Sequence, residues 1–212
     1  TVHCTGKYPY YAQRLWRENG VRLQITDGDR EALQHTVDFV SFSYYSSKVV
    51  AADESKYQMA NGNVMRGLKN PFVPTSDYDY PIDPEGLRYI LNYLYDHFHK
   101  PLFVAENGIG AREQLVALPN GVRTVEDDAR IQFHRGHIQA MERAIADGVE
   151  VFGYTSWGPI DCVSAASAEI TKRYGFVYVD RNQDGTGTLE RFRKKSFDWY
   201  KKVIASNGED LS

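Results

Sequence analysis

The 212-residue sequence has few cysteines, no long apolar run and almost no excess of charge. Its two cysteines, Cys4 and Cys162, form no Cys-x-x-Cys pair, and the six histidines have no zinc-binding spacing, so we expect neither a metal nor another cofactor. No apolar run could span a bilayer, which argues against a membrane protein. The net charge of −3 predicts no general attraction to nucleic acid. With so little cysteine, a reducing cytoplasm is the simplest expected location.

The chain also lacks an initiator Met and any apolar leader, so we expect it to begin inside a longer protein. Its content of 42% hydrophobic and 25% charged residues is ordinary for a globular domain, and we predict one domain over residues 1–212. Aromatic residues are plentiful, with 15 Tyr and 10 Phe. Most of them should fill the core, although aromatic-rich clefts also stack on sugar rings.

Strand and helix patterns alternate along the chain, which indicates a parallel α/β fold. We expect strands over 38–45, 102–106 and 149–157, with helices over 8–20, near 30–35, from 84 to 98, from 127 to 147 and over 194–205. The long loop over 51–82 should cover a site. Three strands cannot close a barrel, which needs eight strands in about 250 residues. The chain is therefore expected to be part of a larger fold.

Glu106 ends the apolar strand that begins at Leu102 and enters an Asn-Gly turn. A carboxylate at the end of a buried strand is costly unless it has a function. Parallel strands that end in this way carry catalytic groups in barrel enzymes, so Glu106 is our candidate nucleophile. From spacing alone, a carboxylate that caps a loop or pairs with a cation fits equally well.

Several motifs in one order resemble glycoside hydrolase family 1. Three of them end strands, namely Ser43-Tyr44-Tyr45, Glu106-Asn107-Gly108 and Thr155-Ser156-Trp157-Gly158, and two further stretches cover 172–180 and 194–204. The resemblance extends over essentially all 212 residues. It implies the C-terminal portion of a TIM (β/α)8 barrel, with about three parallel strands, flanking helices and an incomplete barrel.

Within that family, the chain resembles the members that act on 6-phospho-β-glucosides. Ser164 and Ala165 stand where members that bind plain sugars carry a Glu and a Trp. A carboxylate would repel a phosphate of roughly −1.5 to −2 charges, whereas a hydroxyl can donate to it. The resemblance assigns Ser164, Lys172 and Tyr174 to phosphate binding and Trp157 to sugar binding. A 6-phospho-β-galactosidase is the alternative, which Ala165 disfavours because those members tend to have Trp there.

The resemblance implies a retaining mechanism with two carboxylates roughly 5–5.5 Å apart. Glu106 would attack the anomeric carbon, and Tyr45 would orient Glu106 through a hydrogen bond. The family's acid/base Glu lies in an Asn-Glu-Pro motif, which does not occur here. We therefore expect the isolated chain to be inactive or nearly so, and to need the missing N-terminal half of the barrel as its partner. A non-catalytic phospho-sugar-binding half-barrel is a further alternative, and exposed strand edges make self-association plausible.

Other residues receive less specific predictions. Ser43 stands where many members of the family have Asn, and Ala168 stands where Gly is expected in the phosphate loop. Arg173 is expected to be structural. The charges of 191–195 are expected to lie on a solvated helix face. His134 and His137 have no partner pattern, and no role is predicted for them.

Overall fold

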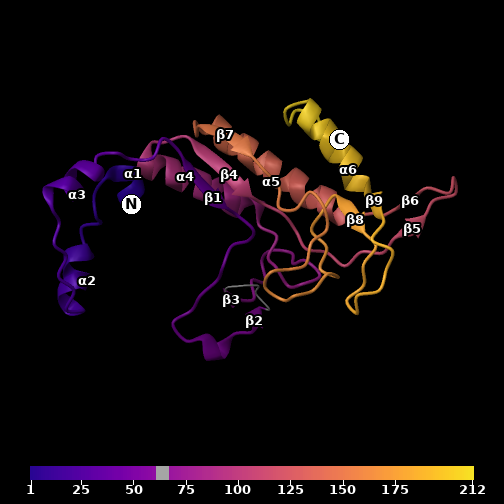
Figure 1. Ribbon diagram of the computed structural model, residues 1–212, viewed down its shortest axis with the longest axis horizontal. Helices are drawn as coiled ribbons and strands as arrows, with labels where there is room; N and C mark the ends of the chain where they lie inside the picture. Colours follow the sequence, from indigo (N-terminus) through magenta and orange to yellow (C-terminus); the bar gives the residue numbers. More distant parts are fainter. Residues whose placement is uncertain (61–66) are drawn as a thin grey trace.

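A computed structural model describes residues 1–60 and 67–212. Its centre is a parallel three-stranded sheet in the order β1-β4-β7, formed by Val40–Ser43, Leu102–Glu106 and Val151–Tyr154. Helix α4 (Pro84–Phe98) joins β1 to β4, and α5 (Asp128–Ala146) joins β4 to β7 (Figure 1). The predicted α/β arrangement of three strands with flanking helices is therefore present, and the described strands do not close into a barrel.

Local sequence determines where α4 begins and ends. The Asp83 side chain accepts a hydrogen bond from the backbone N–H of Gly86 at 3.0 Å, which caps the first turn, and Pro84 occupies the first helical position. The helix ends at His99, which adopts a left-handed conformation (φ 48°), shortly before Pro101. These signals agree with the helix predicted from the sequence.

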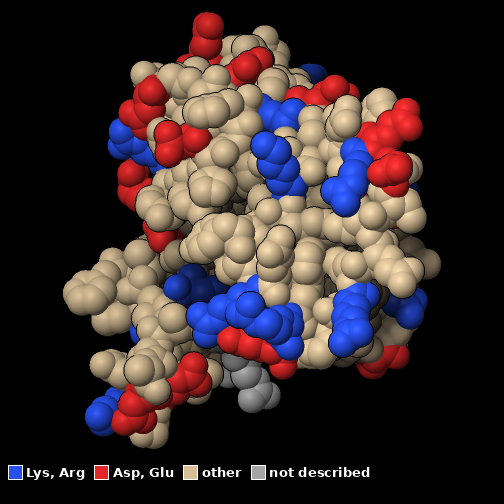
Figure 2. Space-filling view, turned by 90° about the vertical axis from the view of Figure 1, so that its left-hand side faces the viewer, with Lys and Arg blue, Asp and Glu red and all other residues tan. Residues whose placement is uncertain are grey.

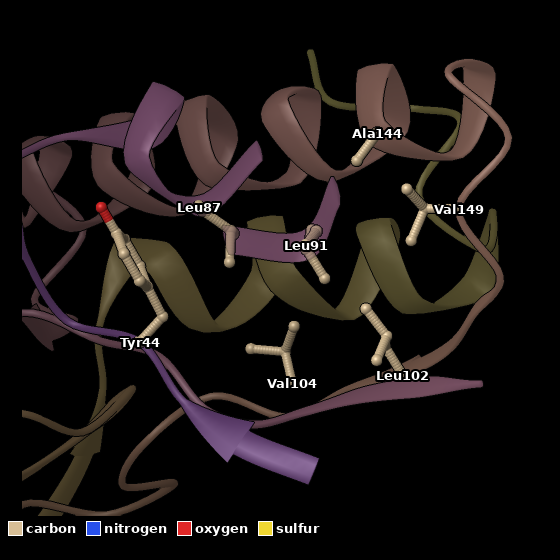
Figure 3. Close-up of a cluster of buried hydrophobic side chains, with 7 residues drawn as sticks. All are labelled: Tyr44, Leu87, Leu91, Leu102, Val104, Ala144 and Val149. Carbon is tan, nitrogen blue, oxygen red and sulfur yellow. The ribbon is translucent and has the colours of Figure 1, made fainter. Parts of the chain in front are cut away.

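The main hydrophobic core lies between the sheet and these two helices (Figure 3). Leu87 and Leu91 of α4 and Leu102 and Val104 of β4 have no exposed surface. Burial of one such side chain contributes about 1.5–3 kcal/mol, so these contacts hold β4 firmly under the helices. The strand that ends in Glu106 is thus the most deeply buried part of the sheet.

The opposite face of the sheet remains open. Phe39 and Phe152 are 46% and 54% exposed, and their rings lie 5.1 Å apart in an edge-to-face arrangement. The ring of Phe103 in β4 lies 5.3 Å from that of Phe152. Strands β1 and β7 each have a single neighbour in the sheet, so each leaves one edge unpaired among the described residues.

Smaller elements surround this unit. Three pairs of short antiparallel strands form between β2 and β3, β5 and β6, and β8 and β9. The remaining elements are α1 (Val2–Thr5), α2 (Ala12–Glu18), α3 (Asp27–Ala32), η1 (Glu54–Lys56), β2 (Met59–Ala60), β3 (Gly67–Leu68), β5 (Val116–Ala117), β6 (Arg123–Thr124), β8 (Val177–Val179), β9 (Arg191–Arg193) and α6 (Lys195–Ala205). Helices α1 to α3 lie to the left of the sheet in Figure 1, on the side away from α6.

Several details differ from the sequence predictions. Strands β1 and β7 are shorter than the strands expected over 38–45 and 149–157, and α3 begins at Asp27 rather than near residue 30. The helix expected over 8–20 is shorter and covers only α2. The loop over 51–82 contains η1, β2 and β3, and its positions 61–66 lie outside the described residues. The run 191–195 is not a solvated helix face, because 191–193 form β9 and Lys194 is 1% exposed. Lys194 is buried because its ammonium meets Glu113 and Asp161, which are distant in the sequence.

The described surface carries both signs of charge. On the face seen in Figure 2, Lys and Arg side chains alternate with Asp and Glu around a broad area of other residues. No helix within 1–60 and 67–212 is long and apolar enough to cross a membrane. The same residues contain no group of three or more His, Cys, Asp or Glu side chains arranged to hold a metal ion.

Candidate active site

Parallel pairing brings three predicted site segments to one edge of the sheet. Ser43 at the end of β1 pairs with Glu106 at the end of β4, and the N–H of Tyr44 donates to the Glu106 carbonyl at 2.8 Å. The N–H of Trp157, just beyond β7, donates to the Asn107 carbonyl at 2.8 Å. The carboxyl ends of all three strands therefore converge around the Glu106 turn, as expected for parallel strands that build a site.

Two hydroxyl groups hold the Glu106 carboxylate. Oγ of Ser43 and Oη of Tyr45 each donate to Oε2 of Glu106, both at 2.9 Å. Burial raises the pKa of Tyr45, and its hydrogen bond to Glu106 raises it further. Tyr45 therefore remains a protonated donor, and the structure places it next to Glu106. Ser43, noted in the sequence only as an unusual residue, is a second donor.

The residue after Glu106 is fixed from behind. Asn107 is fully buried, and its amide donates to the Tyr44 carbonyl at 2.7 Å. The Tyr154 hydroxyl donates to Oδ1 of Asn107 at 2.7 Å, and Nδ1 of His134 lies 2.9 Å from that hydroxyl. Because the Tyr154 proton is used toward Asn107, His134 donates from Nδ1. Burial lowers the pKa of His134 well below its usual value, so the ring stays neutral.

A cavity of about 320 Å³ opens beside this turn. Five of the six predicted site residues line it: Tyr45, Trp157, Ser164, Lys172 and Tyr174. Glu106, the sixth, is bonded to the lining residues Ser43 and Tyr45. The structure thus brings all six predicted residues to one place.

Lys172 is the main charge of this cavity. It is only 4% exposed, and its ammonium donates to the Tyr80 hydroxyl at 3.2 Å. The rings of Tyr78, Tyr80 and Tyr174 surround the ammonium, with centroids at 5.0, 4.5 and 5.7 Å. No carboxylate of the described residues forms an ion pair with Lys172. A buried cation held by aromatic rings and one neutral hydroxyl keeps its charge available to an anionic ligand.

Ser164 and Tyr174 lie beside Lys172. Ser164 is 2% exposed, and its Oγ lies 3.5 Å from Oη of Tyr174. The loop after Ser164 is closed by backbone hydrogen bonds from Ser164 to Glu169 and from Ala168 to Ser164. Ala168 adopts φ 55°, the left-handed region that favours glycine. This agrees with the expectation of Gly at that position.

Three further residues of the site carry little or no signal in the sequence. Tyr78 and Tyr80 belong to the long loop, and their rings pack on the Lys172 ammonium. Lys172 follows Tyr80 by 92 positions in the sequence. Lys48 lines the same cavity, with its ammonium 5.8 Å from the centroid of the Tyr80 ring. The only signal for the tyrosines was the aromatic content of a loop expected to cover a site, and Lys48 had none.

Comparison with known proteins identifies the family. The sequence model described as "Glycosyl hydrolase family 1" matches residues 1–209. A 6-phospho-β-glucosidase of Clostridium longisporum is 53% identical over 210 residues, covering 99% of this chain and 44% of the relative. A 6-phospho-β-galactosidase of Clostridium acetobutylicum is 33% identical over 220 residues, which cover 93% of this chain and 44% of that relative. The chain therefore spans less than half the length of these curated relatives.

A solved structure has the same fold over nearly all of the chain. A β-glucosidase from Thermotoga maritima in complex with deoxynojirimycin aligns with a TM-score of 0.75 and 28% sequence identity. The alignment covers 98% of this chain and 43% of that structure. The incomplete barrel expected from the sequence thus corresponds to part of a larger family fold.

Proposed function

The chain belongs to glycosyl hydrolase family 1, and from that premise we propose that it is the C-terminal part of a retaining 6-phospho-β-glucosidase. It would carry the nucleophile and the phosphate site in a single partial-barrel domain, residues 1–212. The observation that carries the proposal is a shared cavity: the hydroxyl donors of Glu106 and the buried ammonium of Lys172 line the same space.

Glu106 is the proposed nucleophile. Its carboxylate would attack the anomeric carbon of a 6-phospho-β-glucoside, forming an ester bond to the sugar while the glycosidic C–O bond breaks. A separate carboxylic acid would protonate the leaving oxygen and then take a proton from the water that hydrolyses the ester. Tyr45 and Ser43 would hold Glu106 in orientation by the two hydrogen bonds to Oε2.

The 6-phosphate would occupy the part of the cavity around Lys172. The Lys172 ammonium would supply the charge, and the hydroxyls of Ser164 and Tyr174 would donate hydrogen bonds. Trp157, which is 37% exposed in the cavity wall, would form a flat surface for the sugar ring. The name of the Clostridium longisporum relative supports this substrate class.

A 6-phospho-β-galactosidase is the second candidate for the whole protein, and it differs only in the sugar epimer. Ala165 lines the cavity, where a Trp is expected in such enzymes, and identity to the Clostridium acetobutylicum 6-phospho-β-galactosidase is 33%. Both features favour the glucoside. We also propose a cytoplasmic setting, with which the free thiols of Cys4 and Cys162 are compatible.

The acid/base carboxylate would come from a partner segment, the N-terminal half of the barrel. The open sheet face with Phe39, Phe103 and Phe152, and the unpaired edges of β1 and β7, offer surfaces for it. The isolated chain would then be inactive and would tend to self-associate. A monodisperse monomer by light scattering would contradict self-association.

The test is a grafted enzyme. In the Clostridium longisporum 6-phospho-β-glucosidase, the 210 matching residues are replaced by this chain. We expect the grafted enzyme to hydrolyse p-nitrophenyl 6-phospho-β-D-glucoside in preference to the galacto epimer and the unphosphorylated glucoside, and Glu106→Gln to abolish this activity. A folded but inactive grafted enzyme would favour the non-catalytic phospho-sugar-binding alternative. The isolated chain is assayed as well. If it hydrolyses the substrate and Glu106→Gln abolishes that hydrolysis, its proposed inactivity is wrong.

A further inference from the structure

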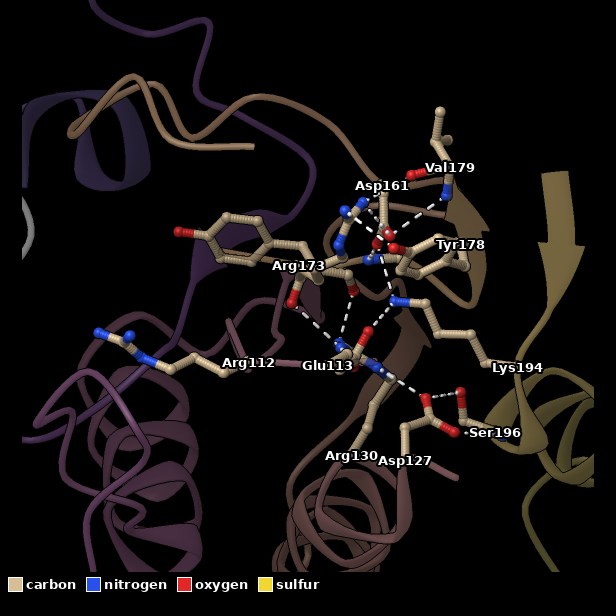
Figure 4. Close-up of polar contacts among 12 residues, drawn as sticks. Arg112, Glu113, Asp127, Arg130, Asp161, Arg173, Tyr178, Val179, Lys194 and Ser196 are labelled. Carbon is tan, nitrogen blue, oxygen red and sulfur yellow. Dashed lines mark hydrogen bonds and ion pairs between the residues drawn. The ribbon is translucent and has the colours of Figure 1, made fainter. Parts of the chain in front are cut away.

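Figure 4 shows a buried network of charged side chains, and one of them, Arg130, binds backbone carbonyls of the cavity-lining residues Ile109 and Tyr174. The network contains three cations and three carboxylates, each in at least one ion pair: Arg130, Arg173, Lys194, Glu113, Asp127 and Asp161. Cations and carboxylates balance within the network. It therefore leaves the charge of Lys172 uncompensated and has no net charge of its own with which to attract a phosphate.

Arg130, the third residue of α5, is the centre of this network. Its side chain is fully buried, and every one of its five N–H groups has an acceptor. Two of these acceptors are carboxylates: Nε donates to Asp127 at 3.0 Å, and Nη2 donates to Glu113. The other three acceptors are backbone carbonyls of two different segments.

These carbonyls belong to the segments that carry the proposed site. Nη1 donates to the carbonyls of Ile109 at 2.8 Å and Tyr174 at 2.6 Å, and Nη2 donates to that of Arg173 at 3.0 Å. Ile109 lies three residues after Glu106, and the other two follow Lys172 directly. One guanidinium group therefore joins the turn after the proposed nucleophile to the segment that carries Lys172 and Tyr174.

The two joined segments are in direct contact and hydrogen-bonded to each other. Ala111 and Arg173 exchange two backbone hydrogen bonds, at 2.9 and 3.0 Å. A Cβ on Gly110 would lie 2.8 Å from Cγ of Lys172, so the lysine stem passes directly over this glycine. A shift of either segment would therefore move the Lys172 ammonium relative to Glu106.

From this geometry we propose that Arg130 is a positioning residue, which fixes the separation between Glu106 and the phosphate-binding side chains of Lys172 and Tyr174. Arg130 is not among the residues that line the cavity. It acts by holding three carbonyls at once, which requires the planar fork of an arginine and exceeds what one lysine ammonium can reach. This inference rests on the proposed function of the cavity.

The test substitutes Arg130→Lys, which keeps the charge but cannot hold all three carbonyls. Binding of glucose 6-phosphate and of glucose to the 212-residue chain is followed by NMR titration. We expect Arg130→Lys to weaken glucose 6-phosphate binding at least about tenfold. In the grafted enzyme, we expect a raised KM for the phosphorylated substrate. A purely structural role would instead lower the folded fraction, and hence kcat, at unchanged KM.

The matched control is Val203→Ala in α6, a buried residue of a separate hydrophobic cluster. We expect it to lower stability by creating a cavity and to leave glucose 6-phosphate affinity unchanged. If Arg130→Lys does not fold, Glu113→Gln is measured in its place. It weakens one contact of the guanidinium and one of Lys194, and it keeps an acceptor oxygen. We expect a smaller loss of affinity in the same direction.

Two failures are distinguishable. A wild-type chain that binds glucose 6-phosphate no better than glucose would overturn the proposed function. A wild-type chain that prefers glucose 6-phosphate, with folded Arg130→Lys or Glu113→Gln binding it equally well, would overturn only the role of Arg130.

Discussion

The phenol of Tyr45 donates a hydrogen bond to Oε2 of Glu106, and 2.9 Å separates the two oxygens. The two residues are 61 positions apart in the sequence and meet because β1 and β4 pair in parallel. The contact leaves the second carboxylate oxygen, Oε1, free of these two hydroxyl donors. Under the proposed function, Oε1 is the oxygen that attacks the sugar.

Tyr45→Phe removes one donor while keeping the ring. A hydrogen bond to a charged group contributes about 1.5–3 kcal/mol, so kcat of the grafted enzyme should fall roughly tenfold to a hundredfold. The matched control is Tyr10→Phe, because Tyr10 is 95% exposed and should leave kcat unchanged. An unaltered kcat in Tyr45→Phe would show that the hydroxyl has no part in the reaction.

The strand ends could be predicted from the sequence because local apolar patterns specify them. The runs around β1, β4 and β7 place Tyr45, Glu106 and Trp157 just where parallel strands terminate. Parallel pairing then brings these positions together without further information. Strand ends therefore predict the places of Tyr45, Glu106 and Trp157. Ser164, Lys172 and Tyr174 end no strand, and only the resemblance to glycoside hydrolase family 1 points to them.

The surroundings of the site could not be predicted, because their contacts are distant in sequence. Lys194 meets Glu113 across 81 positions, and Arg130 meets Arg173 across 43. The charged run that contains Lys194 has the same composition as a solvated surface. Only the pairing of β8 with β9 and the position of Asp161 place its ammonium inside the molecule.

Lys172→Met should separate phosphate recognition from sugar recognition. Loss of the buried ammonium should weaken glucose 6-phosphate binding to the chain roughly tenfold to a hundredfold, with glucose binding unchanged. Lys48 lies in the same cavity but is exposed, so Lys48→Met should weaken binding only up to about fivefold. Lys201→Met in α6 is the control for net charge. Equal effects of all three substitutions would indicate general electrostatics rather than a site.

His137 should make the chain sensitive to acid. Burial lowers the pKa of His137 to about 4, whereas an unfolded histidine titrates near 6.5. Between these values the unfolded chain binds a proton that the native chain does not. The free energy of unfolding is therefore undiminished by His137 above pH 6.5 and falls as the pH is lowered toward 4. From pH 7 to pH 5 this contribution amounts to about 2 kcal/mol.

The measurement is urea unfolding of the 212-residue chain at pH 7 and pH 5. We expect the loss of stability between the two pH values to be about 2 kcal/mol smaller in His137→Leu than in the wild type. Burial raises the pKa of Glu113, which contributes with the opposite sign, but it is present in both proteins and cancels in the difference. Equal losses in the two proteins would mean that His137 is not held neutral.

Ala168→Gly should stabilise the chain. Ala168 is exposed and adopts φ 55°, where a Cβ carries a penalty of about 1–2 kcal/mol that glycine avoids. After the greater backbone entropy of an unfolded glycine is subtracted, a net gain of about 0.5–1 kcal/mol remains. Ala146→Gly, at the exposed end of α5, should have the opposite sign. Chemical denaturation distinguishes these outcomes, and two losses of equal size would contradict strain at Ala168.

Gly110→Ala should disturb the phosphate site without touching a ligand. The added Cβ would lie 2.8 Å from Cγ and 2.9 Å from Cε of Lys172, and 3.2 Å from the ring of Tyr174. Real contacts are not so short, so the lysine stem must move away from the tyrosine rings that hold its ammonium. We expect glucose 6-phosphate binding to weaken at least about tenfold, because a charge-assisted contact depends on alignment.

The control for this substitution is Gly28→Ala in α3, where the nearest atom to the new Cβ is Oγ1 of Thr26 at 3.8 Å. Alanine fits there and favours the helix, so affinity should be unchanged and stability equal or higher. If Gly110→Ala binds glucose 6-phosphate as tightly as the wild type, the ammonium can reach the ligand from more than one stem position. The close packing of Lys172 on Gly110 would then not determine phosphate affinity, and the positioning proposed for Arg130 would lose one of its supports.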